Sequence, residues 1–409
     1  MKPHITGLGI VTPFGVGVDP YWTALLDSTN GIGPITRFDG GKYATGLAGE
    51  HTGFDPRDHL PARLLPQTDR VTQFALVATR EALDDAAIPD GTYSEHASAV
   101  VTANNGGGFE FAQKEMQALW SRGPAHVSAY QSFAWFYAVN TGQISIRHNL
   151  RGAARALVTD DTGGMEAIGQ ARRQLRHDCE LVLAGAVDTN LCPWGWSAYT
   201  SAGLMATDPD PRTAYRPFSP HADGFVSGEG GAIMTVERPD RAGARPAYAE
   251  IAGFASTFDG VARDGRGLER AIRVALRDAE VDAGDVDVVF ADGFGTREMD
   301  DREARAIDAV FGPGGVPVTV PKTGIGRLGC AGSALDVATA CLAIAKQVVP
   351  PTPRYQLSDA ASALRVVDHP APGRVHTVLV LARGRGGFNS AMVLTKPHTE
   401  LRQDNGRTQ

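Results

Sequence analysis

The side chains able to act as nucleophiles, metal ligands or phosphate binders are few and scattered in this sequence. The four cysteines are too widely spaced for a CxxC metal pair, and we interpret them as reduced and mostly buried. The histidines are equally dispersed, so no metal site is expected. Two glycine clusters, Gly106 to Gly108 and Gly228 to Gly231, match neither Rossmann nor P-loop spacing and are interpreted as tight turns. Asp300, Asp301 and Glu303 are interpreted as the solvated start of a helix.

The elements that would position such side chains occur twice along the chain. The strand-like ITGLGIVTP from Ile5 matches IAGFAST from Ile251, and the helical pattern FALVATREALDDAAI matches LERAIRVALRDAEV. Buried-strand runs follow from Ser98 and from Val286, each ending at a glycine-rich turn. The segment ALVTDDTGGMEAIGQARRQL, a strand turning sharply into a helix, corresponds to VTVPKTGIGRLGCAGSALDVATACLAIA. This alternation predicts an α/β fold of two duplicated halves, built from parallel βαβ units with helices on the sheet faces.

Composition limits the classes of partner. The chain has 409 residues and a net charge of −7, and it shows neither a Lys/Arg run nor a basic helix face. Nucleic acid and anionic membranes are therefore not expected as partners. No apolar run reaches about 18 residues and the amino terminus lacks a signal-peptide pattern, so we expect a cytoplasmic protein. The halves are expected to span residues 1–240 and 249–399, with a frayed tail at 400–409.

Two segments carry a family resemblance. RPFSPHADGFVSGEGGAIMTVE, from Arg216 to Glu237, closely resembles the RPF…DGFV.GEG signature of β-ketoacyl synthases, and GRGGFNSA from Gly384 resembles their carboxy-terminal glycine loop. The resemblance covers nearly the whole chain. It implies the thiolase-like fold, a five-layered α-β-α-β-α core, with cap and interface insertions in the amino-terminal half.

The resemblance also locates three catalytic positions, and none of them holds a catalytic residue. The family uses a cysteine nucleophile at a strand-to-helix turn and two histidines. Asp161 stands at the nucleophile position, with Gly164 closing the turn. Asp292 replaces the first histidine in DGFGT, and Arg327 replaces the second in KTGIGRLG, where Lys322 is retained. The resemblance thus implies a degenerate site without catalytic residues.

Asp161 is the one candidate for residual chemistry. A carboxylate at a helix N-terminus is stabilised as the anion, so we expect its pKa to fall. An ionised carboxylate only accepts hydrogen bonds and cannot stabilise a developing oxyanion. Asp161 or Thr162 is instead expected to be the N-cap of a helix running to about His177. The alternative is a self-sufficient acyl-transfer enzyme or decarboxylase that uses Asp161.

A scaffold without its triad resembles one subfamily in particular. KEMQALWSRGP, SFAWFYAVNTGQISIRHN and CPWGW are similar to the chain-length factor, the β subunit of the ketosynthase heterodimer in bacterial type II polyketide synthases. That resemblance implies an active ketosynthase α subunit as partner, together with an acyl carrier protein and a growing polyketide chain. No cofactor would be bound directly, because the carrier's phosphopantetheine arm enters through the partner.

The same resemblance implies a polyketide tunnel at the heterodimer interface. Phe109, Ala112 and Met116 are spaced i, i+3, i+7 and lie along one helical face of the segment similar to the family's gating helix. Trp194, Gly195 and Trp196 are expected to shape the far end. Since alanine is small and methionine is pliable, we expect a deep tunnel that favours roughly decaketide products. The alternative is that this face is plain core.

The run YQSFAWFYAVN contains five aromatic residues and is expected to form an interface core. Phe133, Trp135 and Phe136 are the predicted contacts with the partner, and an internal core helix is the alternative. A further alternative is a subunit that only stabilises its partner and does not influence product length.

Overall fold

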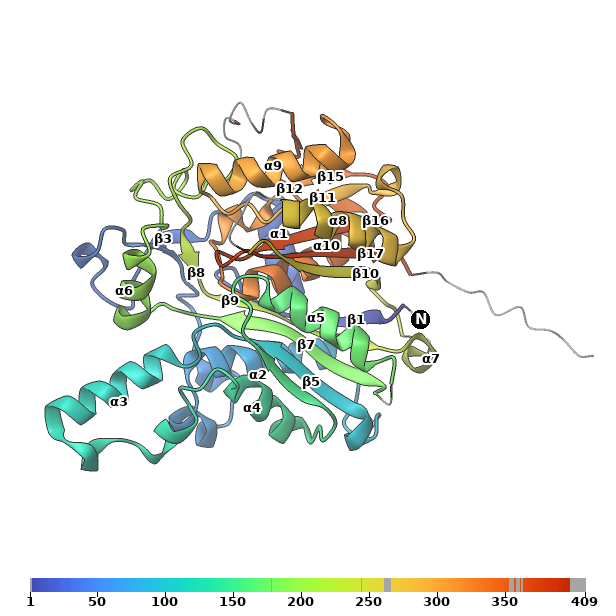
Figure 1. Ribbon diagram of the computed structural model, residues 1–409. Helices are drawn as coiled ribbons and strands as arrows, with labels where there is room; N and C mark the ends of the chain where they lie inside the picture. Colours follow the sequence, from blue (N-terminus) through green and yellow to red (C-terminus); the bar gives the residue numbers. More distant parts are fainter. Residues whose placement is uncertain are drawn as a thin grey trace, which may run out of the picture.

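Two halves of the chain build two half-sheets joined edge to edge, as Figure 1 shows. The computed structural model describes residues 2–397 except Asp178, Ala244, 261–265, 353–356, 358–360 and Ser362. The expected frayed tail at 400–409 lies outside the described residues.

The amino-terminal half contributes the first set of elements. Its main strands are β1 (His4–Thr12), β5 (Ser98–Ala103), β6 (Ala154–Leu157), β7 (Leu181–Asp188) and β9 (Gly230–Glu237). Its helices are α1 (Val18–Leu26), α2 (Arg70–Asp85), α3 (Phe109–Arg122), α4 (Val139–His148), α5 (Gly163–Gln174), α6 (Pro193–Ser201) and α7 (Pro239–Ala242). Short strands are β2 (Gly15–Val16), β3 (Ile32–Pro34), β4 (Leu47–Gly49) and β8 (Ser227–Gly228).

The carboxy-terminal half repeats the pattern with fewer insertions. Its main strands are β10 (Ala249–Phe258), β11 (Val288–Phe290), β12 (Pro317–Thr319), β16 (Thr377–Arg383) and β17 (Phe388–Thr395). Its helices are α8 (Arg266–Ala279), α9 (Arg297–Phe311) and α10 (Ala331–Lys346). Short strands are β13 (Val348–Val349), β14 (Arg365–Val366) and β15 (Ala371–Pro372).

The strand order confirms the duplication. The first half-sheet runs β1-β9-β7-β5-β6 and the second runs β10-β17-β16-β11-β12, with the same pairing senses at each step. The two meet where β1 pairs antiparallel with β10, at His4↔Glu250 and Ile5↔Ala249. Only the outer strands of each half are parallel, because β9 and β17 run antiparallel to both neighbours. The expected parallel pairing is therefore present among the outer strands, and β9 and β17 add antiparallel pairs to each half-sheet.

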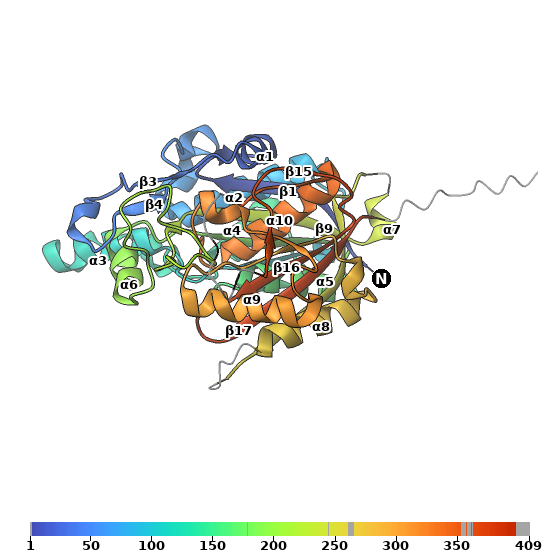
Figure 2. The same ribbon diagram turned by 90° about the horizontal axis from the view of Figure 1, so that it is seen from above.

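Helices and half-sheets form the five expected layers. Helices α2 and α4 pack on the outer face of the first half-sheet, and α8 packs on the outer face of the second, with α9 beside it (Figures 1 and 2). Helices α5 and α10 contact each other and strands of both half-sheets, so they form the central layer. The thiolase-like α-β-α-β-α core is thus confirmed.

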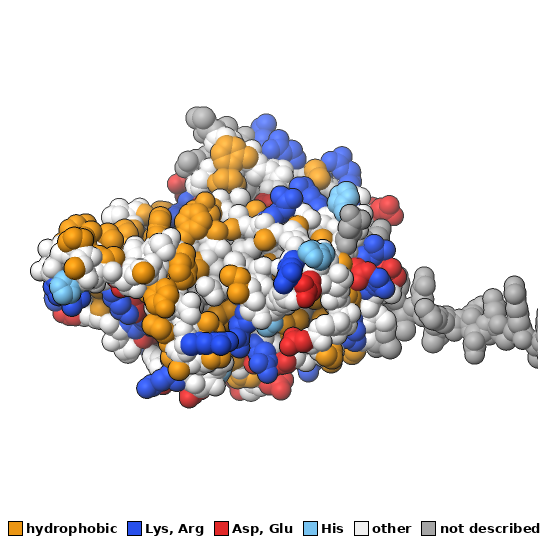
Figure 3. All heavy atoms as spheres, turned by 90° about the horizontal axis from the view of Figure 1, so that it is seen from below, with side chains coloured by type: hydrophobic (Ala, Val, Ile, Leu, Met, Phe, Trp, Pro, Cys, Tyr) orange, Lys and Arg blue, Asp and Glu red, His pale blue; other side chains and the backbone are white. Residues whose placement is uncertain are grey.

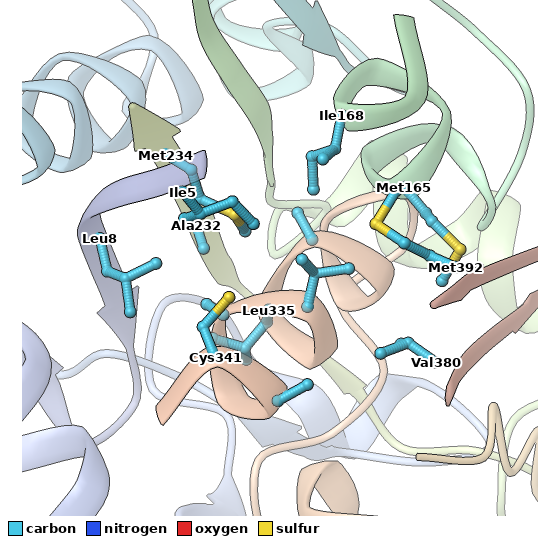
Figure 4. Packing of buried hydrophobic residues seen from close by; sticks show 14 of the residues in the cluster. Ile5, Leu8, Met165, Ile168, Ala232, Met234, Leu335, Cys341, Val380 and Met392 are labelled. Carbon is cyan, nitrogen blue, oxygen red and sulfur yellow. The ribbon is translucent and has the colours of Figure 1, made fainter. Parts of the chain in front are cut away.

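Close packing of the central layer positions the site described below. Every residue of α10 from Ala331 to Ile344 is buried, as expected for a helix that is apolar on nearly all sides (Figure 4). At the start of α5, a Cβ on Gly164 would lie 2.7 Å from the Cys330 carbonyl oxygen. The lack of a side chain there lets the N-termini of α5 and α10 approach each other directly. All four cysteines are buried, as expected.

Glycines in the first strand of each half allow the outer helices to pack closely on the sheet. A Cβ on Gly9 would lie 1.7 Å from the Ala78 carbonyl oxygen of α2, and one on Gly253 would lie 2.2 Å from the Ala275 carbonyl oxygen of α8. Real Cβ atoms cannot approach backbone oxygen so closely. These glycines therefore allow helix and sheet to pack at backbone distance in both halves.

Candidate functional site

The turn from β6 into α5 carries Asp161, the residue predicted to stand at the family's nucleophile position. Asp160 adopts a positive φ of 53°, and Thr162 occupies the N-cap position of α5. The Thr162 hydroxyl donates to the Thr159 carbonyl at 2.7 Å, so no side chain caps the helix. Thr162 therefore occupies the expected N-cap position, but its side chain does not accept the hydrogen bond from a helix amide that an N-cap residue usually accepts. Asp161 turns its carboxylate toward the second half of the molecule.

The three degenerate positions meet in one ion-paired cluster. Arg327 Nε donates to Asp161 Oδ2 at 2.8 Å, and Arg327 Nη2 donates to both carboxylate oxygens of Asp292 at 3.0 Å. All three side chains are buried. The sequence located these positions but did not predict that they pair with one another, across 166 residues in the case of Asp161 and Arg327.

A second cation extends this cluster. Lys322 donates to Asp336 and its Nζ lies 3.9 Å from Asp292 Oδ1. Arg327 also donates to the Arg383 carbonyl oxygen at 3.0 Å, and its guanidinium lies 4.4 Å from the centre of the Phe294 ring. Sequence reasoning missed Asp336. The available signal was an aspartate inside the otherwise apolar run AGSALDVATACLAIA.

Burial controls the ionisation of this cluster. Desolvation raises the pKa of Asp161, and the ion pair with Arg327 opposes that rise. The expectation of a lowered pKa is therefore wrong, because desolvation is the largest effect on the Asp161 carboxyl. Burial alone would lower the pKa of Arg327, but Asp292 and Asp161 raise it well above its ordinary value. A permanently charged guanidinium thus holds both carboxylates as hydrogen-bond acceptors.

The nearest thiol does not supply a nucleophile. Cys330 lies at the N-terminus of α10, and its Sγ is 3.4 Å from Asp188 Oδ2. Burial raises the pKa of Asp188 to about 7. Burial, together with Asp188, raises the pKa of Cys330 well above its usual range. Since the thiolate is the reactive form, Cys330 is inert at neutral pH.

The start of α9 is buried rather than solvated. Asp300 accepts from the Gly295 and Phe218 amides at 3.0 and 2.9 Å, and Glu303 accepts from the amides of Asp292 and Gly293 at 2.7 and 2.9 Å. Burial raises the pKa of Asp300 to about 8 and that of Glu303 to about 7. The expectation of a solvated helix start is wrong for these two residues, which instead hold the loop that carries Asp292.

The predicted tunnel residues lie on α3 and α6. The Phe109 and Trp194 rings stack with centroids 5.4 Å apart at 23°, and a Cβ on Gly195 would lie 3.1 Å from Phe109 Cδ2. Ala112 is buried and Met116 is half-buried on the same helix. The fold therefore brings Phe109, Trp194 and Gly195 together, with Ala112 and Met116 further along α3.

The predicted interface segment carries exposed aromatic side chains. Trp135, Phe136 and Tyr137 are 45%, 38% and 41% exposed, and Phe133 is half-buried. Hydrophobic side chains gather at the end of the molecule that α3 forms, where Trp120 is 81% exposed (Figure 3). No helix spans the segment, since α4 begins only at Val139. The alternative of an internal core helix is therefore wrong.

One helix departs from the charge pattern expected from the sequence. Helix α8 places Arg266, Arg270, Arg273 and Arg277 along an exposed side that lines a groove of about 550 Å³. The expectation that no helix has a basic face is wrong for α8. Among the described residues, no helix is both long and apolar enough to cross a bilayer, and no acidic, cysteine or histidine cluster is arranged to hold a metal ion.

Comparisons with known proteins agree with this fold. The model of the β-ketoacyl synthase N-terminal domain matches residues 3–242, and that of the C-terminal domain matches residues 248–356. The chain is 51% identical over 399 residues to the tetracenomycin polyketide synthase ketoacyl synthase beta subunit of Streptomyces glaucescens, covering 96% of this chain and 98% of that protein.

Solved structures show the same architecture. The ishigamide ketosynthase/chain length factor superposes with a TM-score of 0.89 at 26% identity, covering 97% of this chain and 99% of that chain. A type II ketosynthase, described in complex with its acyl carrier protein and bound to a hexaketide, shares the fold with a TM-score of 0.87 at 24% identity, covering 97% and 99%. The chain therefore belongs to the β-ketoacyl synthase family, and within it to the ketosynthase β subunits, or chain-length factors, of type II polyketide synthases.

Proposed function

We propose that this chain is a non-catalytic subunit that pairs with an active ketosynthase and sets the length of the polyketide that its partner builds. The observation that carries the proposal is the buried cluster of Asp161, Arg327 and Asp292 at the nucleophile and histidine positions. Condensation on this scaffold needs a thiolate and proton-handling imidazoles. The cluster offers neither.

The cluster also resists conversion into a working site. Arg327 forms hydrogen bonds to two carboxylates, and removing one partner of a buried pair leaves an uncompensated charge that costs about 3–5 kcal/mol. A substrate thioester entering here would have to separate these pairs. This argues against the rival in which Asp161 serves as nucleophile, base or decarboxylase.

Carrier-bound substrate would have to enter through the partner. At the degenerate turn, Gly386 N donates to Asp160 Oδ2 at 3.2 Å and Arg385 Nη2 donates to Asp160 Oδ1 at 3.4 Å. These contacts hold the glycine loop that begins at Gly384 against the turn at Asp160. In an active family member, the nucleophile at this turn would receive the acyl group. We therefore assign the phosphopantetheine arm of the acyl carrier protein to the α subunit, and we extend to this chain the carrier partner of its fold neighbour.

Product length would depend on the gate formed by Phe109, Ala112, Met116, Trp194 and Gly195. A small residue at position 112 and a pliable one at 116 favour a deep tunnel. The exposed aromatic residues Trp135 and Phe136, with Phe133 beside them, would be covered by the partner, because a patch of this kind is an aggregation hazard on a lone chain.

The experiment that tests the proposal is co-expression of the tagged chain with the ketosynthase encoded beside it. We expect a one-to-one complex by native mass, and Met116→Trp is expected to shorten the product. Gln117→Trp, on an exposed position one residue further along α3, is the control and should leave product length unchanged. A complex whose Met116→Trp product has the original length would contradict a length-setting role. Thioester turnover by the isolated chain, abolished by Asp161→Ala, would favour the self-sufficient enzyme.

A further inference from the structure

Two loops at the carboxyl ends of β5 and β7 lie side by side behind the gate. The strands are parallel neighbours that pair as far as Ala103↔Ala186. Asn104 Nδ2 then donates to the Val187 carbonyl oxygen at 3.4 Å, which holds the loop after β5 against the loop after β7. Asn105 follows on the first loop and Asn190 lies on the second. The two loops thus carry two further asparagines, Asn105 directly after Asn104 and Asn190 two residues after the end of β7.

These two amides differ from Asn104 in having buried atoms without partners. Both Nδ2 and Oδ1 of Asn105 are shielded from solvent and have no hydrogen-bond partner among the described residues. The same holds for Oδ1 of Asn190, a residue only 2% exposed. In contrast, Asn104 accepts from the Gly107 amide at 2.5 Å through Oδ1 as well as donating to Val187. The Asn104 side chain therefore stabilises the loop after β5, whereas no hydrogen bond of the Asn105 side chain or of Asn190 Oδ1 does so.

The unpartnered Oδ1 atom of Asn190 borders the aromatic gate. A Cβ on Gly106 would lie 2.7 Å from Asn190 Oδ1 and 3.3 Å from Phe109 Cε2. A Cβ on Gly195 would lie 2.7 Å from the Asn190 carbonyl oxygen and 3.1 Å from Phe109 Cδ2. Glycines at 106 and 195 thus keep Asn190 and the Phe109 ring in close proximity.

A buried amide atom without a partner destabilises the protein, so a ligand that satisfies it binds with a corresponding advantage. A poly-β-ketone chain carries a carbonyl on every second carbon. Those oxygens lose their hydrogen bonds to water when they enter an apolar tunnel. An asparagine side chain offers two N–H donors and one acceptor oxygen, so it can bind a ketone oxygen through one end and an enol hydroxyl through the other.

We propose that Asn190 and Asn105 form a polar subsite beside Phe109 that hydrogen-bonds the keto and enol oxygens of the growing chain. This inference rests on the proposed length-setting function and adds the chemical class of ligand that the gate region accepts. The subsite selects poly-β-ketone chains over reduced, hydrocarbon-like chains of equal length.

The test uses the heterodimer, the acyl carrier protein and malonyl thioester, with product lengths measured by mass spectrometry and melting temperatures measured in parallel. Asn190→Leu and Asn105→Leu each remove an amide at similar volume. We expect at least about a fivefold fall in the ratio of full-length to shortened chains, equivalent to about 1 kcal/mol or one hydrogen bond. Their melting temperatures should stay at or above that of the parent. Asn104→Leu is the matched control and should melt lower, because its amide holds the loop.

Parent-like product ratios in both leucine variants would overturn the subsite. A lowered melting temperature together with an unchanged ratio would do the same, since it would make these amides structural groups bridged by water. Should Asn190→Leu fail to fold, Asn190→Ala provides the same comparison without added bulk. Met116→Trp is measured alongside. If Met116→Trp shortens the product and the asparagine variants do not, the subsite fails while the length-setting function stands.

Discussion

Replacing Arg327 with methionine should destabilise the protein more than any conservative surface change. The guanidinium donates to Asp161 at 2.8 Å and to Asp292 at 3.0 Å, and all three side chains are buried. Methionine fills a similar volume but leaves two carboxylates without their cation. Breaking a buried pair in this way costs about 3–5 kcal/mol.

That loss converts into a measurable shift in melting temperature. An unfolding entropy of about 2.1 cal/mol/K per residue over 409 residues amounts to about 0.9 kcal/mol/K. A loss of about 3–5 kcal/mol therefore lowers the melting temperature by about 3–6 °C. Differential scanning calorimetry on the purified heterodimer provides the measurement, taken from the transition in which this chain unfolds. Arg277→Met, on an exposed arginine of α8, is the control and should change the melting temperature by less than about 1 °C.

A double-mutant cycle separates pairing from packing. Asp161→Asn should cost less than Arg327→Met, since Arg327 keeps Asp292. The double variant should lose about 1–3 kcal/mol less stability than the two single variants lose together, because the second change removes a charge that the first left unpaired. Strictly additive losses, or an Arg327→Met variant that melts at or above the parent temperature, would refute the ion-pair account of this site.

Three further outcomes follow from the same contacts. Burial raises the pKa of Asp300 to about 8, above its unfolded value of about 4. The folded chain thus binds the extra proton, stability falls as pH rises through this interval, and Asp300→Asn should flatten the decline of melting temperature with pH. Asp161→Cys should acquire no acyl group by intact-protein mass spectrometry, since Arg327 and Asp292 still replace the histidines; a covalent acyl adduct would contradict this. Gly9→Ala should abolish soluble folded protein, because its Cβ would lie 1.7 Å from a helix carbonyl, whereas Gly33→Ala, with no atom within 4 Å, should express normally.

The fold could be predicted largely from repeated local patterns. ITG at Ile5 and IAG at Ile251 both mark a strand whose glycine admits a helix backbone, and both strands shift register at that glycine. Such signals are local, because periodicity and glycine placement depend on neighbours in the chain. The antiparallel direction of β9 and β17 was not predictable in this way. The direction of a strand depends on the end of the sheet at which the chain enters it, and local sequence patterns do not encode that.

Predictions about ionisation and burial were less successful. Asp161 was expected to have a lowered pKa from its helix terminus, and Asp300 with Glu303 was expected to face solvent. Both expectations used the local sequence alone. The first failed because desolvation is the largest effect on the Asp161 carboxyl, and the second because the loop carrying Asp292 and a segment near Phe218 cover the start of α9.

The sequence by itself determined which residue types stand at the three positions predicted to be degenerate, since 161 and 292 are aspartates and 327 is an arginine, and none of these side chains is a thiol or an imidazole. It also determined the duplicated architecture, because each half repeats the same hydrophobic periods. Only the tertiary structure decided what replaces the lost chemistry. Asp161 and Arg327 are 166 residues apart, and their pairing depends on α5 and α10 meeting in the central layer, where exclusion of water makes the ion pair strong and the unpaired charge costly.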